Sequence, residues 1–168
     1  HTNSATATFI FNVATASNYQ ICYKQSSEQN YDYTIFYKDN TQNMKAQDLQ
    51  NRIAMIKEYA PVLSVSIHQN SYPEEYVHGA QVFYYNGSSG GEQLAGLIQT
   101  QLVQDLDPEN HRQIKPNDSY YLLKKTKGTI VIVECGFLSN AAEAGKLCDE
   151  AYQDRVAWSI HKGILQYI

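Results

Sequence analysis

The chain has 168 residues, of which 43% are hydrophobic and 18% are charged, a composition that is typical of a globular domain and not of a disordered chain. This length suffices for one domain with a buried core, and the three cysteines include no C-x-x-C pair. The 13 basic and 17 acidic residues give a net charge of −4 without a basic cluster, so we expect no nucleic-acid partner. No apolar run approaches the ~18 residues that span a membrane.

The first 43 residues carry only weak patterns. Residues 5–15 and 31–40 are rich in β-branched and aromatic side chains, which favours strands. The stretch between them, 16–30, has Ile21 as its only strong aliphatic residue, and we assign it a short helix. This region therefore contributes two strands and one helix to the prediction.

From residue 44 onward, helical and extended patterns alternate regularly. In residues 44–60 apolar side chains recur at helical spacing, and Pro61 ends that helix. The stretch "GTIVIVECGF" (128–137) is almost wholly apolar, as in a strand that is covered on both faces. The same criteria predict strands at 62–68, 79–85 and 120–124, helices at 92–106 and 150–167, a loop at 86–92, and a helix cap formed by Asn140 and Glu143.

Strands that alternate with helices indicate the α/β class. We expect one sheet with helices on both of its faces. No internal repeat or linker interrupts the pattern, so we predict a single domain over residues 1–168.

Two of the predicted strands carry polar residues at their ends. His68 follows the alternating run "LSVSI", and Glu134 lies inside "VIVECGF". A carboxylate in an apolar strand costs several kcal/mol unless it is paired or protonated. Taken singly, His68 is a hydrogen-bonded strand end, and Glu134 is half of an ion pair with Lys124 or Lys125. Ligands of α/β sheets bind beyond the carboxyl ends of strands, so His68 and Glu134 together indicate a metal ligand beside a general base.

Four motifs carry a resemblance to a known family. They are "LSVSIHQNS" (63–71), "GAQVFYY" (79–85), "IKPNDSYYLLKKT" (114–126) and "IVIVECGFLSNAAEA" (130–144), in this order within residues 44–168. They resemble the zinc-dependent N-acetylmuramoyl-L-alanine amidases of bacterial cell walls and sporulation. The resemblance implies a mixed, mostly parallel sheet, and hydrolysis of the amide between N-acetylmuramic acid and L-alanine in peptidoglycan.

The resemblance also implies roles for two residues. His68 would bind Zn²⁺, and Glu134 would be the catalytic acid/base. We expect both side chains to face one cleft, with roughly 4–7 Å between the imidazole nitrogen and the carboxylate oxygen. Asn70, just after His68, either orients substrate or caps the end of the strand.

The expected partners and location follow from the resemblance. Peptidoglycan is the expected substrate, and an activating protein is a further expected partner. We expect a monomer that acts outside the cytoplasmic membrane; no signal peptide is visible at the start of this sequence.

Residues 1–43 depart from the family pattern. The family takes two further zinc ligands from this region, a histidine in a D-x-G-H-G-G turn and a later glutamate, and neither motif occurs here. His1 and Glu28 are the only histidine and glutamate available upstream, and both are weak matches. Three interpretations stay open. The chain is a catalytically silent peptidoglycan-binding or regulatory module, or it uses other ligands, or residues 1–43 do not represent the native N-terminal region.

The remaining basic and imidazole side chains have simpler interpretations. His111 and His161 are predicted to be solvated, and His78 either lies on a surface loop or approaches the site. Arg112 and Lys115 flank "QIKPN" and either form a solvated basic loop or bind a carboxylate of the peptide stem.

Overall fold

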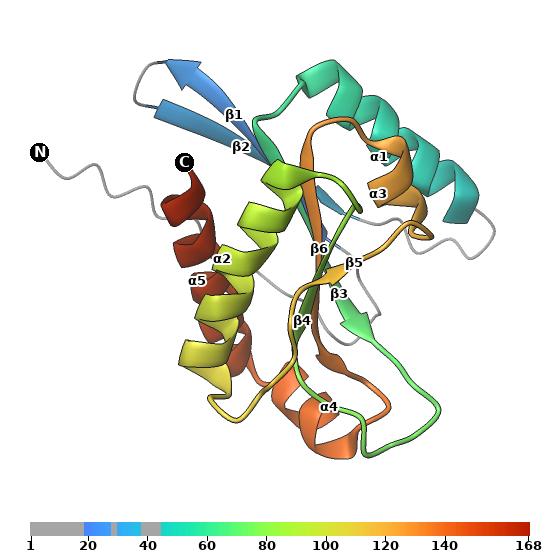
Figure 1. The fold of residues 1–168 in the computed structure, drawn as a ribbon, viewed down its shortest axis with the longest axis vertical. Helices are drawn as coiled ribbons and strands as arrows, with labels where there is room; N and C mark the ends of the chain where they lie inside the picture. The colour runs from blue at the N-terminus through green and yellow to red at the C-terminus, as the bar shows by residue number, and fades with distance from the viewer. Residues whose placement is uncertain (1–18, 28–29, 38–44) are drawn as a thin grey trace, which may run out of the picture.

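The computed structural model describes residues 19–27, 30–37 and 45–168, with side chains from residue 49 onward. In this part of the chain one sheet has the strand order β2-β1-β3-β6-β4-β5 and is flanked by helices (Figure 1). The strands are β1 (Tyr19–Ser27), β2 (Asn30–Tyr37), β3 (Leu63–Asn70), β4 (Gln81–Tyr84), β5 (Lys115–Pro116) and β6 (Thr129–Phe137). The helices are α1 (Lys45–Tyr59), α2 (Ser89–Leu106), α3 (Tyr121–Lys125), α4 (Ala141–Leu147) and α5 (Glu150–Tyr167).

The sheet is mixed, which confirms the predicted α/β class. Strands β3 and β6 pair in parallel, as do β4 and β5, and each of these connections contains at least one helix. The pairs β1–β2, β1–β3 and β4–β6 are antiparallel. Because a loop without a helix joins β3 to β4, the chain reverses direction there. The described sheet therefore has three antiparallel and two parallel strand pairs, which is more antiparallel pairing than we expected.

Alternate residues of the central strands pack on opposite faces of the sheet. Odd-numbered residues of β3 and β6, such as Val65 and Val133, belong to the larger core with α2 and α5. Ile130 and Ile132 of β6 face the other way and pack in a smaller core with apolar side chains of α1 and α3. Figure 1 shows these two pairs of helices on opposite sides of the sheet. The prediction of helices on both faces is confirmed.

Helices α2 and α5 pack closely because one contact point lacks a side chain. A Cβ added at Gly163 of α5 would lie 2.7 Å from the Cα of Ile98 in α2. Only glycine permits this approach of the two backbones. The resulting helix pair covers one face of the sheet.

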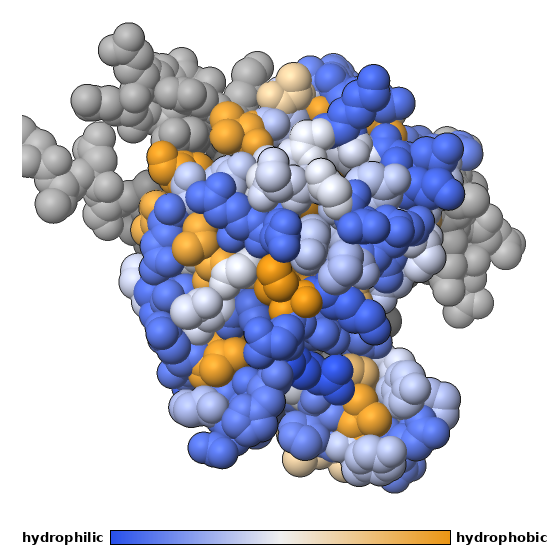
Figure 2. Space-filling model, viewed as in Figure 1, coloured by the Kyte–Doolittle hydropathy of each residue, from blue (hydrophilic) through white to orange (hydrophobic). Residues whose placement is uncertain are grey.

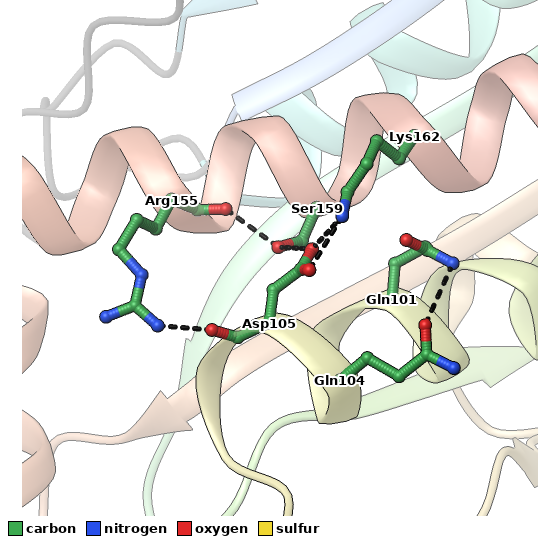
Figure 3. A network of polar contacts seen from close by, with 6 residues as sticks. All are labelled: Gln101, Gln104, Asp105, Arg155, Ser159 and Lys162. Carbon is green, nitrogen blue, oxygen red and sulfur yellow. Dashed lines mark hydrogen bonds and ion pairs between the residues drawn. The ribbon is translucent and has the colours of Figure 1, made fainter.

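A polar network also fastens these two helices (Figure 3). The Asp105 carboxylate of α2 accepts hydrogen bonds from Lys162 Nζ at 2.6 Å and from Ser159 Oγ at 2.8 Å, both on α5. Arg155 donates to the Asp105 carbonyl oxygen. Burial alone would raise the pKa of Asp105, but the bonds from Lys162 and Ser159 outweigh it and lower that pKa. An acid in the last turn of a helix opposes the helix dipole, so these cations offset an unfavourable position.

Three local predictions are wrong. Residues within 120–124 form helix α3 instead of a strand, and both Leu122 and Leu123 enter the smaller core, whereas a strand would point them to opposite faces. Within 16–30 the chain forms β1, because β3 and β2 supply backbone partners on both of its sides. Helix α2 begins at Ser89, inside the predicted loop, because Ser88 caps it through Gly91 N.

The other elements agree with the sequence. The strands predicted at 62–68, 79–85 and 128–137 correspond to β3, β4 and β6. The predicted helices at 44–60, 92–106 and 150–167 correspond to α1, α2 and α5. Residues 31–37 of the predicted strand at 31–40 lie in β2, whereas the predicted strand at 5–15 lies outside the described residues.

Candidate active site

Three polar side chains lie in a row across the end of the central strands. Glu134 of β6 is in register with His68 of β3 on one side and with Gln81 of β4 on the other. Residues in register on neighbouring strands point to the same face of a sheet. This face is the one that α1 and α3 cover, since Ile130 and Ile132 share it. The register thus places His68 and Glu134 on the same face of the sheet. That they face one cleft, and the distance between their polar atoms, stay predictions.

Glu134 is the buried acid of this row. Its side chain is 6% exposed, and its Oε2 atom is buried with no hydrogen-bond partner among the described residues. Burial raises the pKa of Glu134 to about 7. A carboxyl group with such a pKa exchanges a proton readily near neutral pH, as a general acid/base must.

His68 is half-buried, and a serine orients its ring. The Ser66 hydroxyl lies 2.7 Å from His68 Nε2, and Ser66 itself is fully buried two residues earlier on the same face. A polar partner on one ring nitrogen sets the tautomer and the ring orientation, as is usual for imidazoles that bind metals. Nothing in the sequence pattern distinguished Ser66 from the other small residues of the strand.

Asn70 has a local structural role. Its Oδ1 accepts a hydrogen bond from Ser71 N at 2.8 Å, and its carbonyl oxygen accepts one from Leu138 N at 2.8 Å. The first bond caps the end of β3, and the second joins it to the segment that follows β6. Asn70 therefore caps the strand end, and its role in orienting substrate stays a prediction.

Glu143 joins the segments that follow β3 and β6. The predicted cap is confirmed, since Asn140 Oδ1 accepts a hydrogen bond from Glu143 N at 3.0 Å. The Glu143 carboxylate does more: Oε2 accepts from Phe137 N at 2.8 Å and Oε1 accepts from Gly79 N at 2.9 Å. Bonds from backbone N–H groups to a carboxylate are strong ones. The sequence indicated only the cap.

Arg112 contacts the row at its β4 end, through Gln81. Its Nη1 donates to Gln81 Oε1 at 3.3 Å, and its Nε donates to the His78 carbonyl oxygen at 2.6 Å. The guanidinium carbon lies 4.8 Å from the centre of the Phe137 ring, a cation–π distance. Arg112 therefore stands at the edge of the site and not in a freely solvated loop, and Gln81 is a site neighbour that the sequence did not indicate.

Tyr120 adds an aromatic side chain to the same region. Its ring packs against Phe83 of β4, with 5.4 Å between the ring centres. Burial, and secondarily the nearby charge of Glu134, raise the pKa of Tyr120. The phenol therefore stays protonated at neutral pH.

The other histidines differ in exposure. His78 and His111 are exposed, as predicted. The prediction for His161 is wrong: it is half-buried under Trp158 of α5, with 5.6 Å between the ring centres, and burial lowers its pKa.

The described residues fit a zinc ion in part. A catalytic zinc site takes about three protein ligands. His68 supplies one imidazole ligand. Glu134, whose Oε2 has no hydrogen-bond partner among the described residues, lies in register beside it and is assigned to proton transfer, not to zinc binding. No group of three or more His, Cys, Asp or Glu side chains suited to a metal occurs among the described residues. The candidates His1 and Glu28 lie outside them.

The N-acetylmuramoyl-L-alanine amidase family model matches residues 11–166. The chain belongs to this family. It is 40% identical over 123 residues to a germination-specific N-acetylmuramoyl-L-alanine amidase of Bacillus subtilis, a match that covers 73% of this chain and 52% of the relative. It is 31% identical to the amidase LytC of the same organism, over 71% of this chain and 24% of the relative. The chain thus spans about half or less of these two amidases.

Solved amidase structures share the fold. The CwlD amidase of Clostridioides difficile, solved in complex with the GerS lipoprotein, superposes with a TM-score of 0.71 and 38% identity, over 79% of this chain and 69% of that one. The amidase AmiC2 of Nostoc punctiforme superposes with a TM-score of 0.65 and 28% identity, over 70% and 64% of the two chains. The predicted family is therefore confirmed. None of the described helices combines the length and apolar character needed to cross a bilayer.

Proposed function

We propose that this chain hydrolyses the amide that joins N-acetylmuramic acid to L-alanine in peptidoglycan, with Glu134 as the acid/base. The observation that carries the proposal is the buried Glu134 carboxyl, whose Oε2 has no hydrogen-bond partner among the described residues and which lies in register with His68. Membership of the amidase family supports the reaction class.

The proposed role of Glu134 follows from its surroundings. Hydrolysis of an amide needs a group that takes a proton from water and then gives one to the leaving amine. Burial keeps the pKa of Glu134 at about 7, so the deprotonated and protonated forms are both accessible at neutral pH. The proton would move to and from Oε2, the oxygen that has no hydrogen-bond partner among the described residues.

We also propose that His68 is one of the residues that hold a Zn²⁺ ion. When bound, zinc polarises the amide carbonyl and lowers the pKa of water to about 7. Ser66 would keep the His68 ring oriented for this role. The remaining ligands would come from residues outside the described ranges, with His1 and Glu28 as the candidates.

Location and partners are proposed from the relatives. One is named as germination-specific and another structure holds a lipoprotein beside its amidase, so we propose that this chain acts on peptidoglycan outside the cytoplasmic membrane and is activated by a protein partner. Because the family's histidine turn and later glutamate do not occur in residues 1–43, one alternative is a catalytically silent peptidoglycan-binding or regulatory module.

Two variants test the proposal. We expect Glu134→Gln to keep bound zinc and to lower kcat on purified peptidoglycan by at least about 10²-fold, because it removes the proton-transferring group alone. His68→Ala should lose both zinc and activity. Zinc is measured by elemental analysis, and turnover by the release of new amino termini.

Glu109→Gln is the matched control, because Glu109 is an exposed glutamate. It should keep both zinc and activity. If the Glu134→Gln protein retained most of its activity, Glu134 would not be the base. If the unaltered protein bound less than about a tenth of an equivalent of zinc when purified with zinc present, the silent module would be favoured.

A further inference from the structure

The loop at residues 71–80 crosses the end of the candidate site. It joins β3 to β4, and β6 lies between these two strands in the sheet. The loop therefore begins three residues after His68 and passes the end of the strand that carries Glu134. In Figure 1 it lies beside α4, and Figure 2 shows this part of the surface as a lobe set off from the body by an indentation.

Side chains from other segments fasten this loop along its length. The bonds are Tyr72 N to Ser139 Oγ at 3.0 Å, Asn140 Nδ2 to the Glu75 carbonyl at 2.9 Å, Gly79 N to Glu143 Oε1 at 2.9 Å, and Arg112 Nε to the His78 carbonyl at 2.6 Å. Three of the four partners belong to the segment that directly follows β6. The loop backbone is thus ordered before any ligand binds, which lowers the entropic cost of binding.

The fastened loop nevertheless presents aromatic side chains to solvent. Tyr72 is 51% exposed and Tyr76 is 78% exposed, and Leu138 on the adjoining segment is 40% exposed. Tyrosine offers a rigid ring with an apolar face and a polar tip, which suits contact with ligands that are both polar and apolar. Tyr76 is the most exposed large hydrophobic side chain among the described residues.

The charge of the loop favours one part of the substrate over the other. Residues 71–80 include Glu74 and Glu75 and no lysine or arginine. The peptide stem carries carboxylates, which these two acids repel, while Arg112 and Lys115 lie on the β4 side. Sugar rings are uncharged polyols with apolar faces, and a lactyl group coupled to L-alanine is an uncharged amide.

We propose that the loop at 71–80 binds the glycan strand of the substrate, with Tyr72 and Tyr76 stacking on sugar rings next to the muramic acid whose amide is cut. This inference rests on the proposed function. It has one chemical consequence, because cleavage of the amide converts the lactyl group into a carboxylate. Glu74 and Glu75 then repel the product strand, which promotes its release.

Kinetics on two substrates test the proposal. We expect the double variant Tyr72→Ala, Tyr76→Ala to raise the apparent KM for polymeric peptidoglycan by about five- to ten-fold and to leave kcat near the original value. On a soluble muramoyl-peptide with a single sugar ring, kcat/KM should change less than about two-fold. The double variant Tyr72→Phe, Tyr76→Phe should behave as the original protein, because it keeps both rings.

Trp158→Ala is the control for loss of an exposed aromatic residue, since Trp158 lies on α5 and is 59% exposed. It should change neither substrate's kinetics. An equal loss on both substrates, or no loss on the polymer, would overturn the proposal.

A binding measurement separates this inference from the proposed function. The Glu134→Gln protein should sediment with purified peptidoglycan, and an N-acetylglucosamine tetramer should compete with it. Adding Tyr72→Ala and Tyr76→Ala should weaken the sedimentation by about five-fold. Equal sedimentation with and without the two tyrosines would refute the glycan surface even if the unaltered enzyme cleaves peptidoglycan. A loss of sedimentation would support the surface even if no turnover were found.

Discussion

Glu134 is held in an environment that disfavours its charge. The side chain lies in the central strand with apolar residues before it, and burial accounts for its raised pKa. A structural ion pair with Lys124 or Lys125, which the sequence left open, would give the opposite result, and both of these lysines are exposed. The acid therefore makes the folded state less stable when it ionises, as expected of a group that serves function rather than stability.

Glu134 should contribute a pH dependence to the stability of the fold. Glu134 has an ordinary pKa of 4.5 and a folded-state pKa of about 7. Between these values the unfolded chain has lost the proton and the folded chain still holds it, so stability falls as pH rises through this window and levels off above it. Between about pH 4.5 and 8, we expect the free energy of unfolding of the metal-free unaltered protein to fall by up to about 3 kcal/mol more than that of Glu134→Gln.

The measurement is urea unfolding of both proteins at several pH values in the presence of a chelator. Comparing the two proteins at each pH removes the contribution of every other titrating group. If the free energies of unfolding of the two proteins changed with pH in parallel, the fold would not disfavour the charged form of Glu134.

The sequence identified the two central residues of the site but few of their neighbours. The period-two pattern of an apolar strand makes a polar residue at its end conspicuous, so His68 and Glu134 could be found. Gln81 and the carboxylate contacts of Glu143 could not, because they join strands and loops that only the folded chain brings together. Ser66 lies two residues before His68 on the same strand, but nothing in the pattern marked it as the partner of the ring.

At the scale of elements, long periodic segments were predicted well and short ones were not. Helices α2 and α5 have apolar stripes long enough to identify them from the sequence alone. Strand β1 and helix α3 depend on tertiary partners: β1 on pairing with β2 and β3, and α3 on the smaller core. Local propensity is a weak guide where such partners decide the outcome.

The close approach of α2 and α5 leads to a prediction at this scale. Gly163→Ala would place a methyl group 2.7 Å from the Ile98 Cα and 2.9 Å from its nitrogen, and the two backbones would have to separate. We expect a loss of about 1–3 kcal/mol in the free energy of unfolding, measured by urea denaturation.

Gly96→Ala on α2 is the matched control. A Cβ at Gly96 meets no atom within 4 Å, so the change should be neutral or should stabilise the helix by up to about 1 kcal/mol. If Gly163→Ala were as stable as the original protein, the helix pair would not depend on this contact.

At the scale of the whole molecule, the sheet order determines which residues meet. Placing β6 between β3 and β4 sets Glu134 beside His68 and makes the loop at 71–80 cross the site. Element predictions along the chain do not contain this order, since alternating strands and helices are compatible with several arrangements. The resemblance of the motifs to a family implied a mixed sheet, but the strand order comes from the structure.

The same topology links a metal at His68 to the stability of the entire fold. His68 lies in β3, which pairs with β1 on one side and with β6 on the other, so this strand cannot open without disrupting the central sheet. A ligand that binds only the folded state stabilises it by about 2.7 kcal/mol when its concentration is 100 times Kd. For a chain of this size we expect zinc at that level to raise Tm by roughly 5–10 °C, and a chelator to reverse the rise.

His68→Ala should abolish the zinc-dependent rise in Tm, while His111→Ala, at an exposed histidine in the loop before β5, should retain it. Differential scanning calorimetry with and without zinc measures both. A rise that persists in His68→Ala would mean that the metal binds elsewhere. If the unaltered chain showed no rise, the result would favour the silent module, because a site that gains no stability from zinc does not hold zinc in the folded state.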